Sequence, residues 1–180
     1  MGKKGSIYER ELKGILGGEK KIIEKFRKSL SSEEYEWYRS SLKKPFMVIR
    51  AAGSFGVDLI AIRHDFSFPI EVKSSSSPTI RFTQASSRAQ EQAHLFMEEC
   101  RKAGILGLYA FRLKGYRGDP WRIFTLPSEG LTGRAKLLYQ VIPQIPITKE
   151  GNFILKWKEG MPLSKLLSYL NYQEEEEDRV

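Results

Sequence analysis

Apolar positions follow a helical spacing near the start of the chain and change to strand-like runs further on. Residues 6–28 have an apolar stripe that predicts a helix. The Gly17-Gly18 pair in its middle would allow two shorter helices instead. A serine cap and an acidic first turn predict a short second helix from Ser31, and Pro45 ends that segment. Three strands are predicted next, at 46–50, 57–63 and 68–73.

The later part of the chain alternates between the two patterns. Residues 74–82 predict a loop that runs into a short extended piece, and residues 83–102 predict a helix that stops at Gly104. The nearly continuous apolar run 105–113 is typical of a strand that is buried on both faces. Further strands are predicted at 121–126 and 151–158, and further helices at 131–140 and 162–170. This order predicts a single α/β domain in which helices flank a mixed β-sheet.

Length and composition agree with one domain over residues 1–172. The chain has 180 residues, of which 41% are hydrophobic, and this is enough for a core. Cys100 stands alone, which excludes an intramolecular disulfide and a cysteine-based zinc site. The sequence has no run of about 18 apolar residues, as a membrane span needs, and its charged start lacks the apolar core of a signal peptide. We therefore expect a cytoplasmic protein with no membrane partner.

The charge is strongly basic and unevenly distributed. The net charge is +8, although the tail at 173–180 holds five acids and one arginine. The other 172 residues therefore hold 29 bases and 17 acids, a net charge of +12. Such an excess suits a polyanion such as nucleic acid, whose phosphates release counterions when lysine and arginine neutralise them. A basic protein without such a partner stays an alternative, and we expect the tail to be disordered.

Carboxylates and a lysine occupy two neighbouring predicted strands. Asp58 lies in an apolar run, and the next run ends in Glu71, Val72 and Lys73. If the strands are antiparallel neighbours, Asp58 approaches Glu71, and the two carboxylates repel each other unless a cation lies between them. Oxygen ligands, including the carbonyl of Val72, favour Mg²⁺ or Mn²⁺, and Lys73 is placed to hold or deprotonate an attacking water. The alternative is a hairpin whose Glu and Lys face water while Asp58 caps a turn.

These residues, with others before and after them, resemble a known family. The segment "GVDLIAI…PIEVKSS" resembles the metal-binding core of the PD-(D/E)-x-K nuclease superfamily. With "KKGSIYEREL" ahead of it and "VIRAAGS" between, the chain is most similar to archaeal Holliday junction resolvases. The segments "RAQEQAHLFMEECRKAG" and "GNFILKWKEGMPLSKLLSYL" resemble later parts of that family, so the likeness spans most of the chain.

The resemblance implies a fold, an activity and a set of site residues. It implies a restriction-endonuclease-like nuclease core and a Mg²⁺-dependent endonuclease that hydrolyses phosphodiesters at four-way DNA junctions, working as a homodimer. Glu9 would complete the metal site of Asp58, Glu71 and Val72, and Lys73 would be the catalytic lysine. The positions that would contact DNA are Lys3, Lys4, Arg10, Arg50 and Ser54.

Several of these assignments have alternatives. Glu9 also fits a capping box with Ser6 at the start of a helix, Ser54 fits a turn position, and Arg10 and Arg50 fit ordinary ion pairs. A different nuclease of this superfamily, cutting duplex or flapped DNA, and a non-catalytic DNA-binding protein are the other functions that the residues allow.

One segment departs from the family. Residues 17–45 form an inserted, aromatic-rich helical segment, in which Tyr35, Trp37 and Tyr38 interleave with basic residues. This segment would either extend a DNA platform or pack into the core. For the homodimer, the apolar positions near Leu95, Phe96 and Leu108 are candidates for the interface.

Overall fold

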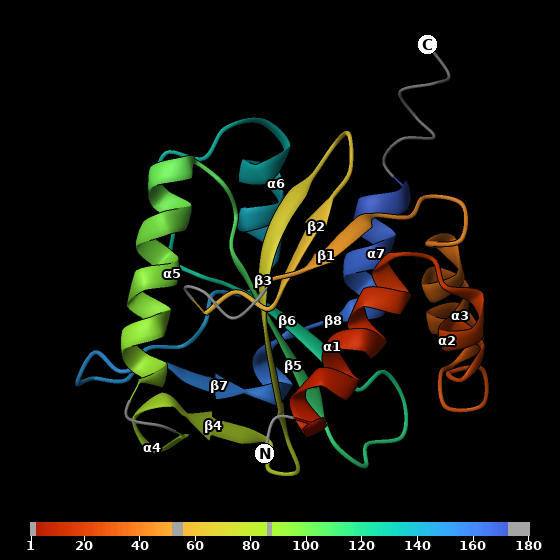
Figure 1. Ribbon diagram of the computed structural model, residues 1–180, viewed down its shortest axis with the longest axis horizontal. Helices are drawn as coiled ribbons and strands as arrows, with labels where there is room; N and C mark the ends of the chain where they lie inside the picture. The colour runs from red at the N-terminus through yellow and green to blue at the C-terminus, as the bar shows by residue number, and fades with distance from the viewer. Residues whose placement is uncertain (1–2, 52–55, 86–87, 173–180) are drawn as a thin grey trace.

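A six-stranded mixed sheet lies at the centre of the computed structural model, which describes residues 3–51, 56–85 and 88–172 and not the side chains of 3–6 and 84–85 (Figure 1). The strand order is β1-β2-β3-β5-β6-β8, and β4 and β7 form a separate two-stranded sheet. The strands are β1 (Met47–Arg50), β2 (Leu59–Ile62), β3 (Ser67–Ser75), β4 (Thr79–Arg81), β5 (Leu108–Leu113), β6 (Trp121–Thr125), β7 (Ile154–Lys156) and β8 (Met161–Pro162). The helices are α1 (Lys3–Leu16), α2 (Lys20–Glu24), α3 (Ser32–Ser40), α4 (Phe82–Ala85), α5 (Ala89–Ala103), α6 (Gly133–Val141), the 3-10 helix η1 (Trp157–Glu159) and α7 (Leu163–Tyr172).

The sheet combines antiparallel and parallel pairing, which confirms the predicted mixed α/β fold. Strands β1, β2 and β3 form an antiparallel meander, and β5, β6 and β8 are also antiparallel. Strands β3 and β5 run parallel, so the chain must cross over between them, and it does so through β4, α4 and α5. This crossover places α5 on one side of the sheet, opposite α1 and α7 (Figure 1).

Each face of the sheet has its own apolar core. On the face of α1 and α7, buried residues from both helices pack against β2, β3 and β5; they include Leu12, Ile15, Leu59, Ile70, Leu108 and Leu167. On the face of α5, the core is rich in aromatic side chains: Phe82, Phe96, Tyr109, Phe111, Phe124 and Phe153. Alternating residues of β5 therefore serve both cores, as the buried apolar run 105–113 predicted.

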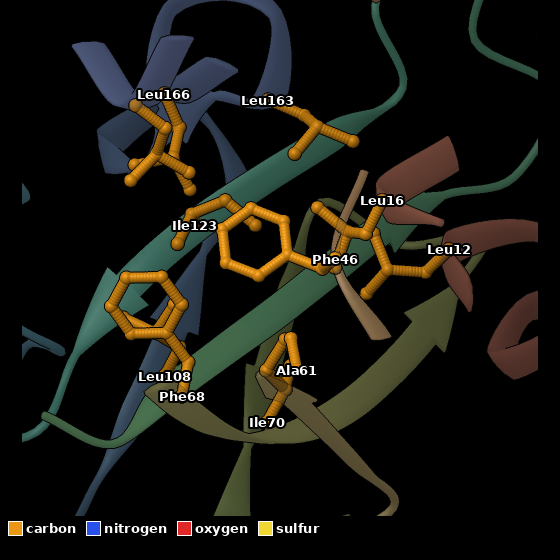
Figure 2. A pocket seen from close by; sticks show the side chains of 11 residues that line it. Leu12, Leu16, Phe46, Ala61, Phe68, Ile70, Leu108, Ile123, Leu163 and Leu166 are labelled. Atoms are coloured by element: carbon orange, nitrogen blue, oxygen red, sulfur yellow. The ribbon is translucent and has the colours of Figure 1, made fainter. Parts of the chain in front are cut away.

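The first core closes around a cavity too small for a ligand. Side chains of Leu12, Phe46, Phe68 and Leu163 point toward one another around it (Figure 2). Its volume is about 10 Å³, at the lower limit for a single water molecule. This space is a gap in side-chain packing and not a binding site for a ligand.

The inserted segment 17–45 packs as part of the domain. Its helix α3 begins with a capping box, in which the Glu34 N–H donates to Ser31 Oγ at 3.1 Å and the Ser31 N–H donates to the Glu34 carboxylate at 2.8 Å. Tyr38 is fully buried in the core, and the ring of Trp37 meets that of Tyr172 of α7 edge to face. Core packing is therefore what the structure shows for these aromatic residues.

Several predicted boundaries differ from the structure. Strand β2 begins at Leu59, so Asp58 precedes the strand, although its N–H still donates to Ile70 O at 3.0 Å and its carbonyl accepts from the Ala51 N–H at 2.9 Å. Strand β3 continues through Ser74 and Ser75, which were predicted to be loop, because β5 supplies them with a parallel partner. The predicted helix 6–28 begins earlier, at Lys3, and divides at Gly17-Gly18 into α1 and α2.

The proposed interface residues are also placed differently from the prediction. Phe96 and Leu108 are buried within the chain, one in each core, whereas Leu95 on α5 is 54% exposed. The prediction of an apolar interface at these three positions is therefore wrong for two of them, because α5 packs Phe96 against one face of the sheet and β5 turns Leu108 into the core on the other face. None of the helices in the described part of the chain has the length and apolar character that crossing a bilayer requires.

Candidate active site

The pairing of β2 with β3 brings Asp58 and Glu71 together. Leu59 pairs with Ile70 in this antiparallel ladder, so the residues one step further along each segment lie opposite each other. The Asp58 carboxylate turns toward β3, where its Oδ2 accepts the N–H of Val72 at 2.8 Å. The predicted proximity of Asp58 and Glu71 is confirmed, and the alternative in which Glu71 faces water is wrong because the residue is only 7% exposed.

The two oxygens of Glu71 differ in whether a hydrogen-bond donor reaches them. Lys73 Nζ donates to Oε1 at 2.9 Å. Within the described part of the structure, the buried Oε2 accepts from no N–H or O–H group, and the carboxyl of Asp58 lies within hydrogen-bonding reach of Glu71. Burial is the largest cause that raises the pKa of Glu71, to about 7; Lys73 lowers this pKa, and neighbouring Asp58 raises it further. A buried carboxylate oxygen that lies beside a second carboxyl and receives no donor is costly, and either a proton or a cation would relieve that cost.

The pKa of Asp58 is shifted in the same direction. Burial raises it most, the hydrogen bond from the Val72 N–H lowers it, the charge of Glu9 raises it, and Lys73 lowers it. Two adjacent carboxyl groups with raised pKa values are typical of a site that binds a cation. Their oxygens are hard donors, so this pair fits Mg²⁺ or Mn²⁺ rather than a softer metal.

Glu9 lies near this pair but is engaged by another residue. Its Oε2 accepts from Nη2 of Arg50 at 2.7 Å, and the two side chains are 19% and 38% exposed. The capping-box alternative is wrong, because α1 begins at Lys3 and Ser6 therefore lies inside the helix.

Across the described ranges, no three His, Cys, Asp or Glu side chains lie close enough together to form a metal-binding group. The structure thus pairs Asp58 with Glu71 and leaves Glu9 with Arg50.

The wall of the site includes Tyr109, which the sequence did not single out. Tyr109 on β5 is the register partner of Glu71, and burial raises its pKa, followed by the charges of Glu71 and Asp58. Gly56 has φ of 71°, and a Cβ there would lie 3.4 Å from Gln92 Cβ and 3.9 Å from Glu71 Oε2. A side chain at this position would be strained and would fill the space beside the carboxylate. No local sequence signal marks Tyr109, because only the β3–β5 register brings it beside Glu71.

The remaining candidates are placed as follows. Arg10 is exposed on α1, and Arg50 ends the edge strand β1. The side chains of Lys3 and Lys4 and all of Ser54 lie outside the described residues. Gln90 on α5 accepts the N–H of Phe153 at 2.9 Å and so holds α5 against the segment that leads into β7.

Comparison with known proteins supports the fold. The chain is similar to the solved structure of Hjc from Archaeoglobus fulgidus, a Holliday junction resolvase from an archaeal hyperthermophile. The TM-score is 0.52 at 17% sequence identity, and the match covers 92% of this chain and 96% of the resolvase. The chain therefore has the fold of this resolvase, which confirms the predicted fold class. No protein-family model matches the sequence, and no curated protein does.

Proposed function

We propose that this protein is a Mg²⁺-dependent endonuclease that cuts DNA at four-way junctions. The observation that carries the proposal is the buried carboxyl pair of Asp58 and Glu71, in which Glu71 Oε2 accepts from no N–H or O–H group of the described residues and the Lys73 ammonium lies beside the pair. The likeness in fold to a Holliday junction resolvase supports the choice of substrate. The basic excess of the chain outside its tail supports a nucleic-acid substrate.

The carboxyl pair would hold the cation. Asp58 and Glu71 supply carboxylate oxygens, and the carbonyl of Val72, between Glu71 and Lys73, is a further candidate ligand. A divalent cation bound there would offset the repulsion between the carboxylates, polarise the scissile phosphate and stabilise the charge that develops on it. Glu71 would bind in its ionised form, so it would release its proton when the cation enters.

Lys73 would act on the attacking water. Its Nζ donates to Glu71 Oε1 and lies at the edge of the buried pair, with the side chain 25% exposed. From this position the ammonium would orient a water molecule toward the phosphorus and contact a phosphate oxygen. The apolar wall behind Glu71, which includes Tyr109, would keep other water away from the carboxylates.

Two symmetric cuts in a four-way junction require two copies of the site. We therefore propose that the protein works as a homodimer, in which each subunit supplies one Asp58–Glu71 pair. Arg10 and Arg50 remain candidates for contact with phosphates, because both side chains are exposed. The mass of the protein in solution, measured by light scattering with and without junction DNA, tests the dimer.

Cleavage of labelled DNA tests the function. Four-way junctions and duplexes of matching sequence are incubated with the wild-type protein, Asp58→Ala and, as a control for removal of an exposed acid, Glu150→Gln. We expect symmetric nicks in the junction with Mg²⁺, none with EDTA, none with Asp58→Ala, and wild-type cleavage with Glu150→Gln. Equal cutting of the duplex would overturn the junction claim. Binding without cleavage in Mg²⁺ and Mn²⁺ would overturn the enzyme claim.

A further inference from the structure

The ion pair between Arg50 and Glu9 connects the edge of the sheet to the candidate metal site. Glu9 comes from α1 and Arg50 from the end of β1, 41 residues apart, and their side chains meet at 2.7 Å. The same end of β1 is bonded to the site, because the Ala51 N–H donates to Asp58 O at 2.9 Å and Arg50 pairs with Leu59. Arg50 is therefore one strand away from the Asp58–Glu71 pair.

Glu9 is near that pair without belonging to it. Its charge acts on Asp58 strongly enough to raise the pKa of that carboxyl, after the larger effects of burial and the Val72 hydrogen bond. Yet a three-carboxylate metal group is absent from the described residues. An oxygen bonded to a guanidinium is a poorer cation ligand, because its lone pair and its negative potential are already engaged.

Arg50 has the chemistry to exchange its partner. Guanidinium binds phosphate with the same fork of N–H groups that it presents to a carboxylate. Its side chain is 38% exposed on the edge strand, where a DNA backbone is able to reach it. Ion pairs at this degree of exposure are weak, so a phosphate held nearby by other contacts would compete with Glu9.

We propose that Arg50 restrains Glu9 in the free protein and releases it when a DNA phosphate takes the guanidinium, so that Glu9 then joins Asp58 and Glu71 around the cation. This inference rests on the proposed function, because it assumes that the site binds a divalent cation and DNA. It assigns Arg50 as a positioning residue that acts through Glu9. The cation site would thus be complete only when substrate is present.

Binding of Mn²⁺ to the free protein tests the restraint without any cleavage reaction. Titration calorimetry, checked by electron paramagnetic resonance of unbound Mn²⁺, is carried out on the wild type, Arg50→Ala, Glu9→Gln and the double variant. We expect Arg50→Ala to bind Mn²⁺ about tenfold more tightly than the wild type, which corresponds to about 1.4 kcal/mol. Glu9→Gln alone should change the affinity less than twofold, because Glu9 is already engaged.

The double variant separates release of Glu9 from simple loss of positive charge. If Glu9 is the ligand that is released, Arg50→Ala should gain nothing in the Glu9→Gln background. A gain that persists there, or weaker binding by Arg50→Ala than by the wild type, would overturn the proposal. Arg39→Ala removes an exposed arginine from another Arg–Glu pair, with Glu36 at 3.0 Å, and should leave Mn²⁺ affinity unchanged. Thermal unfolding followed by circular dichroism verifies that each variant is folded.

The outcome also distinguishes this inference from the proposed function. If no variant binds Mn²⁺, with or without a non-cleavable junction, the metal site and the restraint both fail. If the wild type cleaves junctions but shows no coupling between Arg50 and Glu9, only the restraint fails. If coupling is found without cleavage, the restraint stands and the endonuclease proposal fails.

Discussion

Two buried carboxylates in this protein differ in the number of hydrogen bonds that they accept. Asp119, in the turn before β6, accepts three hydrogen bonds: from Tyr38 OH at 2.7 Å, from the Trp121 N–H at 3.2 Å and from the Ser164 N–H at 2.7 Å. Glu71 accepts one from Lys73, and its other oxygen is buried beside the Asp58 carboxyl and accepts from no N–H or O–H group among the described residues. The two groups are about equally inaccessible, at 2% and 7% exposure.

This difference in hydrogen bonding indicates a structural role for Asp119 and a functional role for Glu71. Asp119 joins the inserted segment, β6 and the start of α7, and donors from all three surround it, so its role is complete within the folded chain. Glu71 is as buried as a structural carboxylate but lacks the hydrogen-bond donors that surround Asp119. This is expected of a group that binds a proton or a cation. Burial raises the pKa of both groups most, whereas hydrogen bonds from Ser164 and Tyr38 lower that of Asp119.

The largest effect that we expect is on catalysis at Glu71. Glu71→Gln keeps the size of the side chain but removes a charged cation ligand, so single-turnover cleavage of a four-way junction should fall by at least about a thousandfold, or about 4 kcal/mol in the barrier. Unfolding in urea with EDTA should show no loss of stability, since the amide oxygen of the glutamine still accepts from Lys73. Cleavage within about tenfold of wild type would show that Glu71 is structural after all.

The next effect is on stability at Asp119. Asp119→Ala leaves the Tyr38 hydroxyl and two backbone N–H groups buried and unpaired, so the free energy of unfolding in urea should fall by about 3 kcal/mol. Mn²⁺ affinity of the folded protein should stay as in the wild type. A variant that lost cation binding while remaining folded would contradict the separation of the two regions.

A third test uses the pH dependence that Glu71 imposes. Its pKa is about 7 in the folded protein against an ordinary value of 4.5, so the folded state binds the proton more tightly. Its contribution to stability is therefore complete below about pH 4.5 and is lost as the pH rises through 7. In EDTA, Glu71→Gln should become more stable than the wild type as the pH rises from 5 to 8, by roughly 1 to 3 kcal/mol.

Addition of Mg²⁺ supplies the control for this pH test. At pH 8 the cation should raise the unfolding temperature of the wild type, because it binds only the folded state, and should have little effect on Glu71→Gln. A difference between the two proteins that does not change with pH in EDTA would mean that the Glu71 carboxyl is ionised with a partner throughout.

The sequence predicts the fold and part of the candidate site because both depend on local patterns. Apolar runs and alternation place the strand that follows Asp58 and the strand that carries Glu71, and a short turn makes these strands antiparallel neighbours. The spacing of Glu71 and Lys73 puts both side chains on one face of a strand. That shared face allows the contact of Lys73 Nζ with Glu71 Oε1 at 2.9 Å.

Contacts between distant segments could not be predicted in the same way. Asp119 lies in "GDPW", which reads as an ordinary turn, and its partner Tyr38 is 81 residues away. Tyr109 reaches Glu71 only through the parallel β3–β5 register, which is set by the crossover. Glu9 was expected among the metal ligands, but its pairing with Arg50 depends on how α1 packs against the end of β1.

The smallest expected effect concerns the attachment of the inserted segment. Tyr38→Phe removes the hydroxyl that donates to Asp119 while keeping the ring that meets Phe26 at 5.2 Å. Asp119 keeps two donors, so the free energy of unfolding should fall by about 1 kcal/mol, while Tyr172→Phe, at an exposed ring, should have no measurable effect. Both variants should cleave junctions at the wild-type rate. If Tyr38→Phe lost cleavage but kept its stability, the contrast between a structural Asp119 and a functional Glu71 would fail, because the inserted segment would then act on the site.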